Sequence, residues 1–177
     1  MNYKNFLVHL ILIALVPFTT QASFTGVSAE IHQVNGIDGY VTWRVYAEFD
    51  DPNDQLIAFY GYDLEPLEIH TAGDFYQNSF GGPTSINISS SQWGFVPDME
   101  WDSFLTVGYP DNTGNLMQNV GFDYTDFEAG NSWTVDDLIG GSIFNLPGDP
   151  MSSPVGGKVL IAQLTTNGDL DLLMNFQ

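Results

Sequence analysis

Hydrophobic and polar residues alternate most regularly between Val41 and Phe49. Successive side chains of a strand point to opposite faces, so this pattern predicts a strand with one buried and one exposed face. The acidic turn Asp50–Asp54 ends the strand, because proline lacks an amide hydrogen and Asp and Asn favour turns. Leu56–Tyr60 is predicted to return as the second strand of a hairpin. The residues predicted to be buried are Val41, Trp43, Val45, Ala47 and Phe49, and those predicted to be exposed are Thr42, Arg44, Tyr46 and Glu48.

The same alternation predicts further strands along the chain. Phe24–Val34 precedes a Gly- and Asx-rich turn and is predicted to form the first hairpin with Val41–Phe49. Asn167-Gly168 is a signal for a tight hairpin near the C-terminus. Val135–Ile139, with aspartates in its first turn, is predicted to be the single short helix. The other predicted strands are Pro66–Thr71, Phe95–Val107, Val120–Tyr124, Lys158–Thr165 and Asp169–Phe176, and Asp126–Asn131 is predicted to be a loop.

This spacing of elements predicts the fold class. About ten short strands, separated by turns rich in Gly, Pro and Asx, are typical of an antiparallel β-sandwich. A jelly-roll-like arrangement fits the long central loops. We therefore expect an all-β fold with at most one short helix.

The N-terminal residues have the pattern of a secretory leader. Lys4 precedes the apolar run Phe6–Phe18, and Thr20-Gln21-Ala22 has the small residues of a cleavage site. The run is shorter than the ~20 residues that a membrane-spanning helix needs. The sequence therefore predicts a signal peptide over residues 1–22, cleavage after Ala22, and a single secreted domain over residues 23–177 without membrane insertion.

The strong excess of acidic residues excludes some classes of binding partner. Without Lys4, only Arg44 and Lys158 oppose 22 acidic residues, a formal net charge of about −20. Nucleic acid and anionic membrane surfaces need a basic face, so neither is expected as a partner. The chain has no cysteine, so no disulfide supports the exported domain.

The acidic turn is the first candidate site. Asp50, Asp51, Asn53 and Asp54 place three carboxylates and an amide within five residues. Calcium prefers such oxygen ligands, so the turn is a candidate Ca²⁺ site that would stabilise the domain. The alternative is a solvated turn whose acids only favour solubility.

Aromatic residues form the second candidate site. Trp93, Trp101 and Trp133 lie near predicted loops or strand ends, where exposed rings beside Asp and Asn would stack on sugar rings. The alternative is that these rings fill the core of a domain without disulfides.

One set of acids resembles the carboxylates of a glycosidase. Asp98, Glu100 and Asp102 would share one face of a strand, with neighbours about 6.5 Å apart. Paired carboxylates at about 5–10 Å are what glycoside hydrolysis needs. A solvated acidic face is the other interpretation, and no nucleophile motif supports an enzyme.

Three segments carry a resemblance to a known kind of domain. Thr42–Leu56, Trp101–Tyr109 and Gly157–Asp171 resemble an uncharacterised secreted β-domain found in cell-surface proteins of environmental, often marine, bacteria. More loosely, the layout is similar to cohesin-like and carbohydrate-binding sandwiches. The resemblance implies an extracellular location and supplies no catalytic or binding residues.

These observations together favour a secreted, non-enzymatic domain of extracellular adhesion, matrix or surface structure. Its expected partner is an extracellular polymer, a glycan or a protein. A carbohydrate-binding module that uses the tryptophans is the alternative, and a glycan-processing enzyme is the third interpretation.

Overall fold

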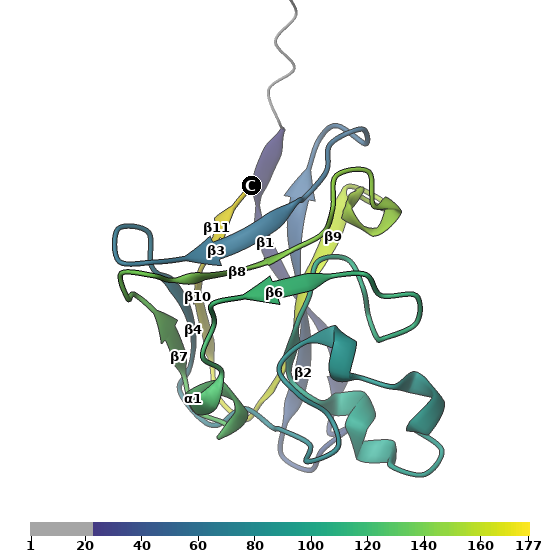
Figure 1. The fold of residues 1–177 in the computed structure, drawn as a ribbon. Helices are drawn as coiled ribbons and strands as arrows, with labels where there is room; N and C mark the ends of the chain where they lie inside the picture. Colours follow the sequence, from purple (N-terminus) through teal and green to yellow (C-terminus); the bar gives the residue numbers. More distant parts are fainter. Residues whose placement is uncertain (1–22) are drawn as a thin grey trace, which may run out of the picture.

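The structure is a computed structural model that describes residues 23–177, and Figure 1 shows that its longest regular elements are strands, joined by loops and short helices. Within this range, eleven strands form three antiparallel sheets, so the predicted all-β, sandwich-like fold is confirmed. The predicted signal peptide lies outside the described residues. No helix in the described part is long and apolar enough to cross a membrane.

One layer is a four-stranded sheet, and the other consists of two smaller sheets. The first layer has the order β1 (Phe24–Val34), β2 (Val41–Phe49), β9 (Lys158–Thr166), β5 (Phe104–Leu105). The smaller sheets have the orders β10 (Leu170–Leu173), β4 (Leu67–Thr71), β7 (Trp133–Val135) and β11 (Asn175–Phe176), β3 (Ala58–Gly61), β8 (Gly141–Phe144), β6 (Gln118–Val120). In Figure 1, β3, β8 and β6 run across the direction of β2 and β9.

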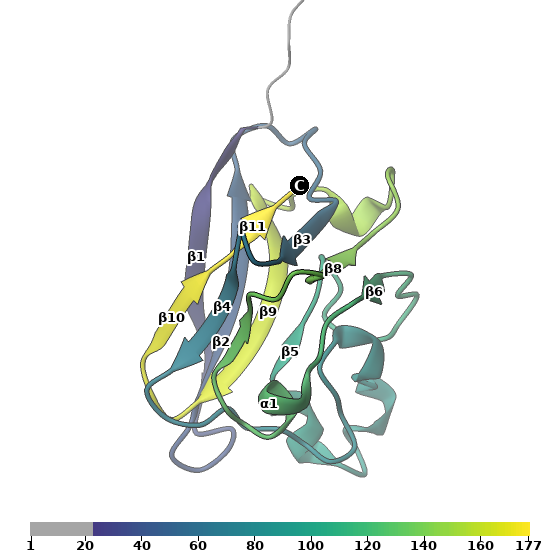
Figure 2. The ribbon, with the colours of Figure 1, turned by 60° about the vertical axis from the view of Figure 1, so that its left-hand side comes forward.

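In the described part of the chain, five short helices lie in the segments that connect the strands. They are the α-helix α1 (Thr125–Glu128) and the 3-10 helices η1 (Ser85–Asn87), η2 (Ser90–Gln92), η3 (Pro97–Trp101) and η4 (Pro150–Ser152). Figure 2 shows the teal segment that contains η1 to η3 beside β5, at one side of the first layer.

The core lies between the two layers. Val45 and Ile161 of the first layer and Phe59 and Ile69 of the second are each 0 % exposed and belong to one continuous apolar cluster. Burying a side chain of this size contributes about 1.5–3 kcal/mol. The layers are therefore held together mainly by the apolar faces that their strands present to one another.

The first predicted hairpin is confirmed, but the two others are wrong. β1 pairs with β2 along its whole length. β3 was expected to pair with β2, yet it pairs with β8 and β11 in the opposite layer. β10 was expected to pair with β9, yet it pairs with β4. Both turns therefore carry the chain from one layer to the other.

The Asn167-Gly168 turn shows why the C-terminal strands separate. The Asn167 Oδ1 atom accepts a hydrogen bond from the amide of Asp74 at 2.7 Å. Gly168 approaches Gly73 so closely that an added Cβ atom would lie 2.2 Å from its nitrogen. Because the turn is docked on the loop that follows β4, β10 leaves the turn beside β4 rather than beside β9.

Two predicted elements have a different structure. The predicted strand Phe95–Val107 is mostly helical and irregular, because Pro97 begins η3 and only Phe104–Leu105 pairs as β5. The predicted helix Val135–Ile139 is instead the end of β7 followed by a turn. There the Asp137 Oδ1 atom accepts hydrogen bonds from the amides of Ile139 and Gly140, a local turn that competes with a helix.

The only α-helix within residues 23–177 is α1, which lies in a segment that the sequence predicts to be a loop. Its Phe127 ring is fully buried and packs against Phe75 with ring centroids 5.5 Å apart. A single apolar residue anchors the helix, so no helical repeat of apolar positions was present to predict it.

The predicted alternation of buried and exposed side chains along β2 is found only in its C-terminal half. Val45, Ala47 and Phe49 are buried as predicted. Thr42, predicted to be exposed, is buried, and its hydroxyl lies 2.8 Å from that of Thr165. The polar face is covered here by another segment, since the Ser103 hydroxyl bonds to the backbone of Thr165. Val41 and Trp43, predicted to be buried, are only partly covered.

Strand β1 forms the exposed edge of the first layer. Ile31 on this strand is 58 % exposed. The pairing with β2 shifts register between Phe24 and Gly26 and again between Ile31 and Gln33. Such bulges at sheet edges hinder pairing with another chain.

Asp102 fixes the segment that covers the polar face. Its carboxylate is fully buried and accepts hydrogen bonds from the amides of Asn78, at 2.6 Å, and Gly82, at 3.1 Å. Burial raises the pKa of Asp102 to about 7, against the lowering effect of these amide donors. Gly81 lies so close to the carboxylate that a Cβ atom there would overlap it.

Asp102→Asn is expected to change how stability depends on pH. The ordinary pKa of an aspartate is about 3.9, so between about pH 4 and 7 the native protein binds a proton that the unfolded chain lacks. The unfolding free energy of the wild type should therefore rise, relative to the variant, by about 1.4 kcal/mol per pH unit as the pH falls through this window. Urea unfolding at a series of pH values measures this difference, and parallel curves would contradict the raised pKa.

Candidate functional site

A groove of about 400 Å³ lies on the outer face of the first layer. Arg44 and Tyr46 point into it because they alternate with Val45 and Ala47, whose side chains enter the core. Loops near Pro110 and η4 form the opposite wall. The groove is lined by Glu30, Arg44, Tyr46, Gly108, Pro110, Pro150, Met151, Ser153, Val155, Lys158, Val159 and Leu160.

Strand register brings the groove residues together from distant parts of the sequence. Glu30 of β1 lies opposite Arg44 of β2. Glu48 of β2 lies opposite Lys158 of β9. Directly opposite residues on one face are close enough for their side chains to interact. Three strands therefore contribute charged side chains to one surface.

Lys158 is the centre of this charge cluster. Its Nζ atom donates hydrogen bonds to Oε1 of Glu30 and, at 3.3 Å, to Oε1 of Glu48. These bonds raise the pKa of Lys158 above its ordinary value. Hydrogen bonds from Ser28 and Lys158 lower the pKa of Glu48. Both of these shifts favour the charged forms of Lys158 and Glu48.

The groove also presents an aromatic ring. The Nζ atom of Lys158 lies 5.6 Å from the centre of the Tyr46 ring, a cation–π distance. Tyr46 is partly exposed. An ordered ring beside fixed charged groups is an arrangement that can stack on a flat apolar surface while the charges bond to polar groups around it.

Trp101 lies on the same side of the first layer, beyond Arg44. Its ring centroid is 6.3 Å from that of His32 on β1. A Cβ atom on Gly36 would lie 2.6 Å from the indole, so the turn after β1 packs directly on this ring. Burial and the nearby Arg44 lower the pKa of His32, which favours its neutral form. Trp101 is partly exposed and extends the row of groups along this face.

The structure separates the three tryptophans predicted to bind a ligand. Trp133 is only 3 % exposed, and its indole nitrogen donates to the backbone carbonyl of Asp123 at 2.7 Å. Its ring stacks against Tyr124 and meets Phe122 edge-on. No face of this ring is free to contact a sugar, so Trp133 is not included in the candidate site.

Trp93 lies apart from the groove lining, after η2. The residue is partly exposed, while its indole nitrogen is buried and has no hydrogen-bond partner among the described residues. Of the three predicted tryptophans, Trp101 is therefore the one that the structure places near the groove.

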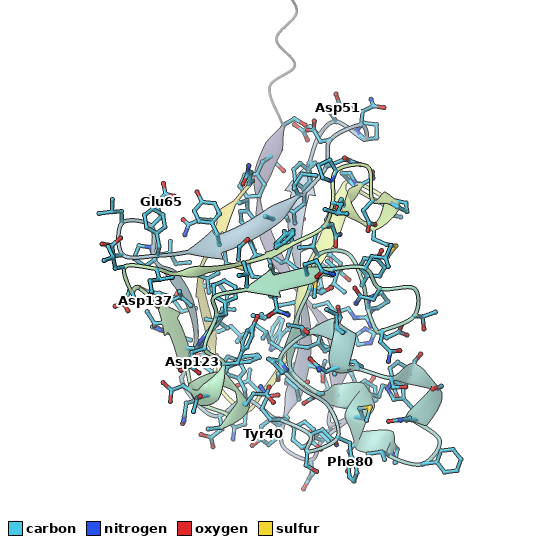
Figure 3. The ribbon with its side chains drawn as sticks, viewed as in Figure 1. Tyr40, Asp51, Glu65, Phe80, Asp123 and Asp137 are labelled. Carbon is cyan, nitrogen blue, oxygen red and sulfur yellow. The ribbon has the colours of Figure 1, made fainter. Side chains whose placement is uncertain are left out.

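The acidic turn uses its side chains for internal hydrogen bonds. Oδ1 of Asp51 accepts from the backbone and side-chain nitrogens of Asn53. Oδ2 of Asp54 accepts from the amide and hydroxyl of Ser23. Asp50 is exposed. Figure 3 shows Asp51 in the loop at the end of the molecule where β1 begins. Among residues 23–177, no group of three or more His, Cys, Asp or Glu side chains is arranged to hold a metal ion.

The predicted row of three acids is wrong. Asp98 and Glu100 lie on the 3-10 helix η3, and Asp102 caps its end with its carboxylate turned into the protein. Asp98 is exposed and Glu100 is partly buried. A 3-10 helix does not place residues i, i+2 and i+4 on one face, so these three side chains do not share a surface.

Most of the groove residues were not predicted as a site. Arg44 and Tyr46 were predicted only to be exposed on a strand, Lys158 was only counted in the charge balance and placed at the start of a predicted strand, and Glu30 was only part of the predicted strand Phe24–Val34. One signal was present in the sequence: Arg44 and Lys158 are the only basic residues, other than histidine, after Lys4. Their convergence depends on the pairing of β2 with β9, which lie more than a hundred residues apart along the chain.

Comparison of the chain with models of protein families, with curated proteins and with solved structures gave no match.

Calcium is expected to raise the melting temperature no more than magnesium does at the same millimolar concentration. One oxygen of each of the Asp51 and Asp54 carboxylates already accepts hydrogen bonds that would compete with a metal ion. Thermal melts in each salt at matched ionic strength measure the difference. A true site at about 100 times its Kd would add about 2.7 kcal/mol. A calcium-specific rise that disappears in Asp51→Asn would restore the turn as a metal site.

Proposed function

We propose that the chain is a secreted, non-enzymatic adhesion or matrix domain that holds an extracellular polymer in the groove on its outer sheet face. The observation that carries this proposal is the convergence of Arg44, Tyr46 and Lys158 on one surface of a strongly acidic chain. Ordered polar groups around an aromatic ring in a concave site are typical of ligand recognition.

An uncharged glycan is the ligand class that the groove chemistry favours. Two cationic and two carboxylate side chains, Arg44, Lys158, Glu30 and Glu48, nearly cancel one another on this face. An anionic polymer would be repelled by the net charge of the rest of the chain. Sugar hydroxyls both donate and accept hydrogen bonds, so they can pair with both kinds of charged group. The Tyr46 ring offers the apolar surface on which a sugar ring stacks.

The carboxylates of the groove are suited to binding rather than to hydrolysis. Glycoside hydrolysis needs one carboxylic acid with a raised pKa to protonate the leaving group. Lys158 instead bonds to both Glu30 and Glu48, and the pKa of Glu48 is lowered. Glu48 is therefore in an environment that disfavours holding a proton, which supports a non-enzymatic role.

Tyr46→Ala is expected to weaken glycan binding about tenfold, equal to about 1.4 kcal/mol, because the stacking surface is lost. A glycan array identifies the bound oligosaccharide, and isothermal titration then measures Kd for both proteins. Tyr62→Ala is the matched control, since Tyr62 is a partly exposed tyrosine after β3 in the opposite layer.

Three results would overturn the proposal in different ways. If the wild type bound no glycan, glycans would be excluded as the ligand of the groove. Equal loss of affinity in Tyr46→Ala and Tyr62→Ala would place the binding surface elsewhere. Release of new reducing ends from the bound oligosaccharide would favour a glycan-processing enzyme over a binding domain.

A further inference from the structure

Ser23 is held by the acidic turn through every polar group it has. Its backbone nitrogen donates to Oδ2 of Asp54 at 2.7 Å, and its hydroxyl donates to the same oxygen at 2.9 Å. The hydroxyl also accepts from the amide of Asp51 at 2.6 Å, and the Ser23 carbonyl accepts from the amide of Asp50. These four bonds lie outside the pairing of β1 with β2, which begins at Phe24.

Ser23 is also the residue that follows the predicted cleavage site. Cutting after Ala22 changes its nitrogen from an amide into an α-amino group, which is protonated near neutral pH because its ordinary pKa is about 7.7–8.0. The structure places this nitrogen within hydrogen-bond distance of a carboxylate oxygen. Cleavage at that bond would therefore turn a hydrogen bond between an amide and a carboxylate into an ion pair between an ammonium group and a carboxylate.

We propose that the turn Asp50–Asp54 is a receptor for the new N-terminus of Ser23, so that removal of the leader after Ala22 locks the start of β1 to the end of β2. Asp54 binds the ammonium group, while the Ser23 hydroxyl links Asp54 to the amide of Asp51. This gives the acidic turn a role that needs no metal ion. This proposed role also predicts the cleavage position, because a start one residue earlier would leave an amide at the nitrogen of Ser23.

The surrounding charges favour a cation at this point. The titratable groups of the turn are Asp50, Asp51 and Asp54, all acidic. The nearest described cation of the sheet, Lys158, is already bonded to Glu30 and Glu48. β11 lies close to the start of β1, because the ring of Phe176 is 5.1 Å from that of Phe24. The next residue, Gln177, has no basic side chain. An ammonium group on Ser23 therefore meets only acidic and neutral partners.

Secretion of the full chain from a bacterial host tests the cleavage position, since the intact mass of the exported protein should correspond to a first residue of Ser23. An NMR titration of this protein then measures the pKa of its α-amino group. Because a carboxylate close to an ammonium favours the charged form, we expect this pKa to be raised by about one unit or more. Asp54→Asn should return it to about 7.7–8.0, the ordinary range.

Asp50→Asn is the matched control. It removes one charge from the same turn, but the Asp50 side chain makes no hydrogen bond to Ser23. This variant should keep most of the raised pKa. The melting temperature of the wild type should exceed that of Asp54→Asn at pH 7, and the gap should close as the pH rises through the raised pKa, where the ammonium loses its proton.

A mass that places the first residue anywhere other than Ser23 would overturn the proposal. An α-amino pKa that is the same in the wild type and in Asp54→Asn would do so as well. An equal fall in Asp50→Asn and Asp54→Asn would show a general effect of the acidic turn rather than a specific receptor. None of these results depends on whether the groove binds a glycan.

Discussion

Burial of β9 on both faces is the constraint from which the rest of the structure follows. All of its residues after Lys158 are buried. Ile161 and Ala162 are consecutive yet both belong to the core, because the register against β2 shifts between Val45 and Tyr46. This bulge lets the inner side of β9 fill the sandwich core along its whole length. The polar residues Gln163 and Thr165 are then left on the outer side and need partners there.

The segment between β4 and β5 supplies those partners. The side chain of Gln163 donates to the backbone carbonyls of Glu100 and Asp102, and the amide of Thr165 donates to the hydroxyl of Ser103. The buried carboxylate of Asp102 in turn holds the loop that reaches Gly82. The segment between β4 and β5 covers the outer face only as far as Arg44, whose Nε atom lies 3.4 Å from Oε1 of Gln163. Beyond that point the outer face is open, and the open part is the groove.

The sequence predicted what depends on local pattern. The bounds of β1 and β2 and their hairpin follow from alternation and a turn signal, and the structure reproduces them. The sequence did not predict which layer the next strand joins after a turn. Asn167-Gly168 is compatible both with a hairpin and with packing of the turn on Gly73. The candidate site depends on pairing across the sheet. Alternation placed Tyr46 on the exposed face, but only the register of β2 with β9 brings Lys158 over its ring.

Binding of an uncharged glycan to the outer face of β2 and β9 is best tested by NMR mapping of the binding surface. Amide spectra of isotope-labelled protein would be followed during titration with the oligosaccharide selected on the array. The shifted amides should cluster at Glu30, Arg44, Tyr46 and Lys158. Shifts confined to β10, β4 and β7 in the opposite layer, or no shifts at saturating glycan, would contradict it.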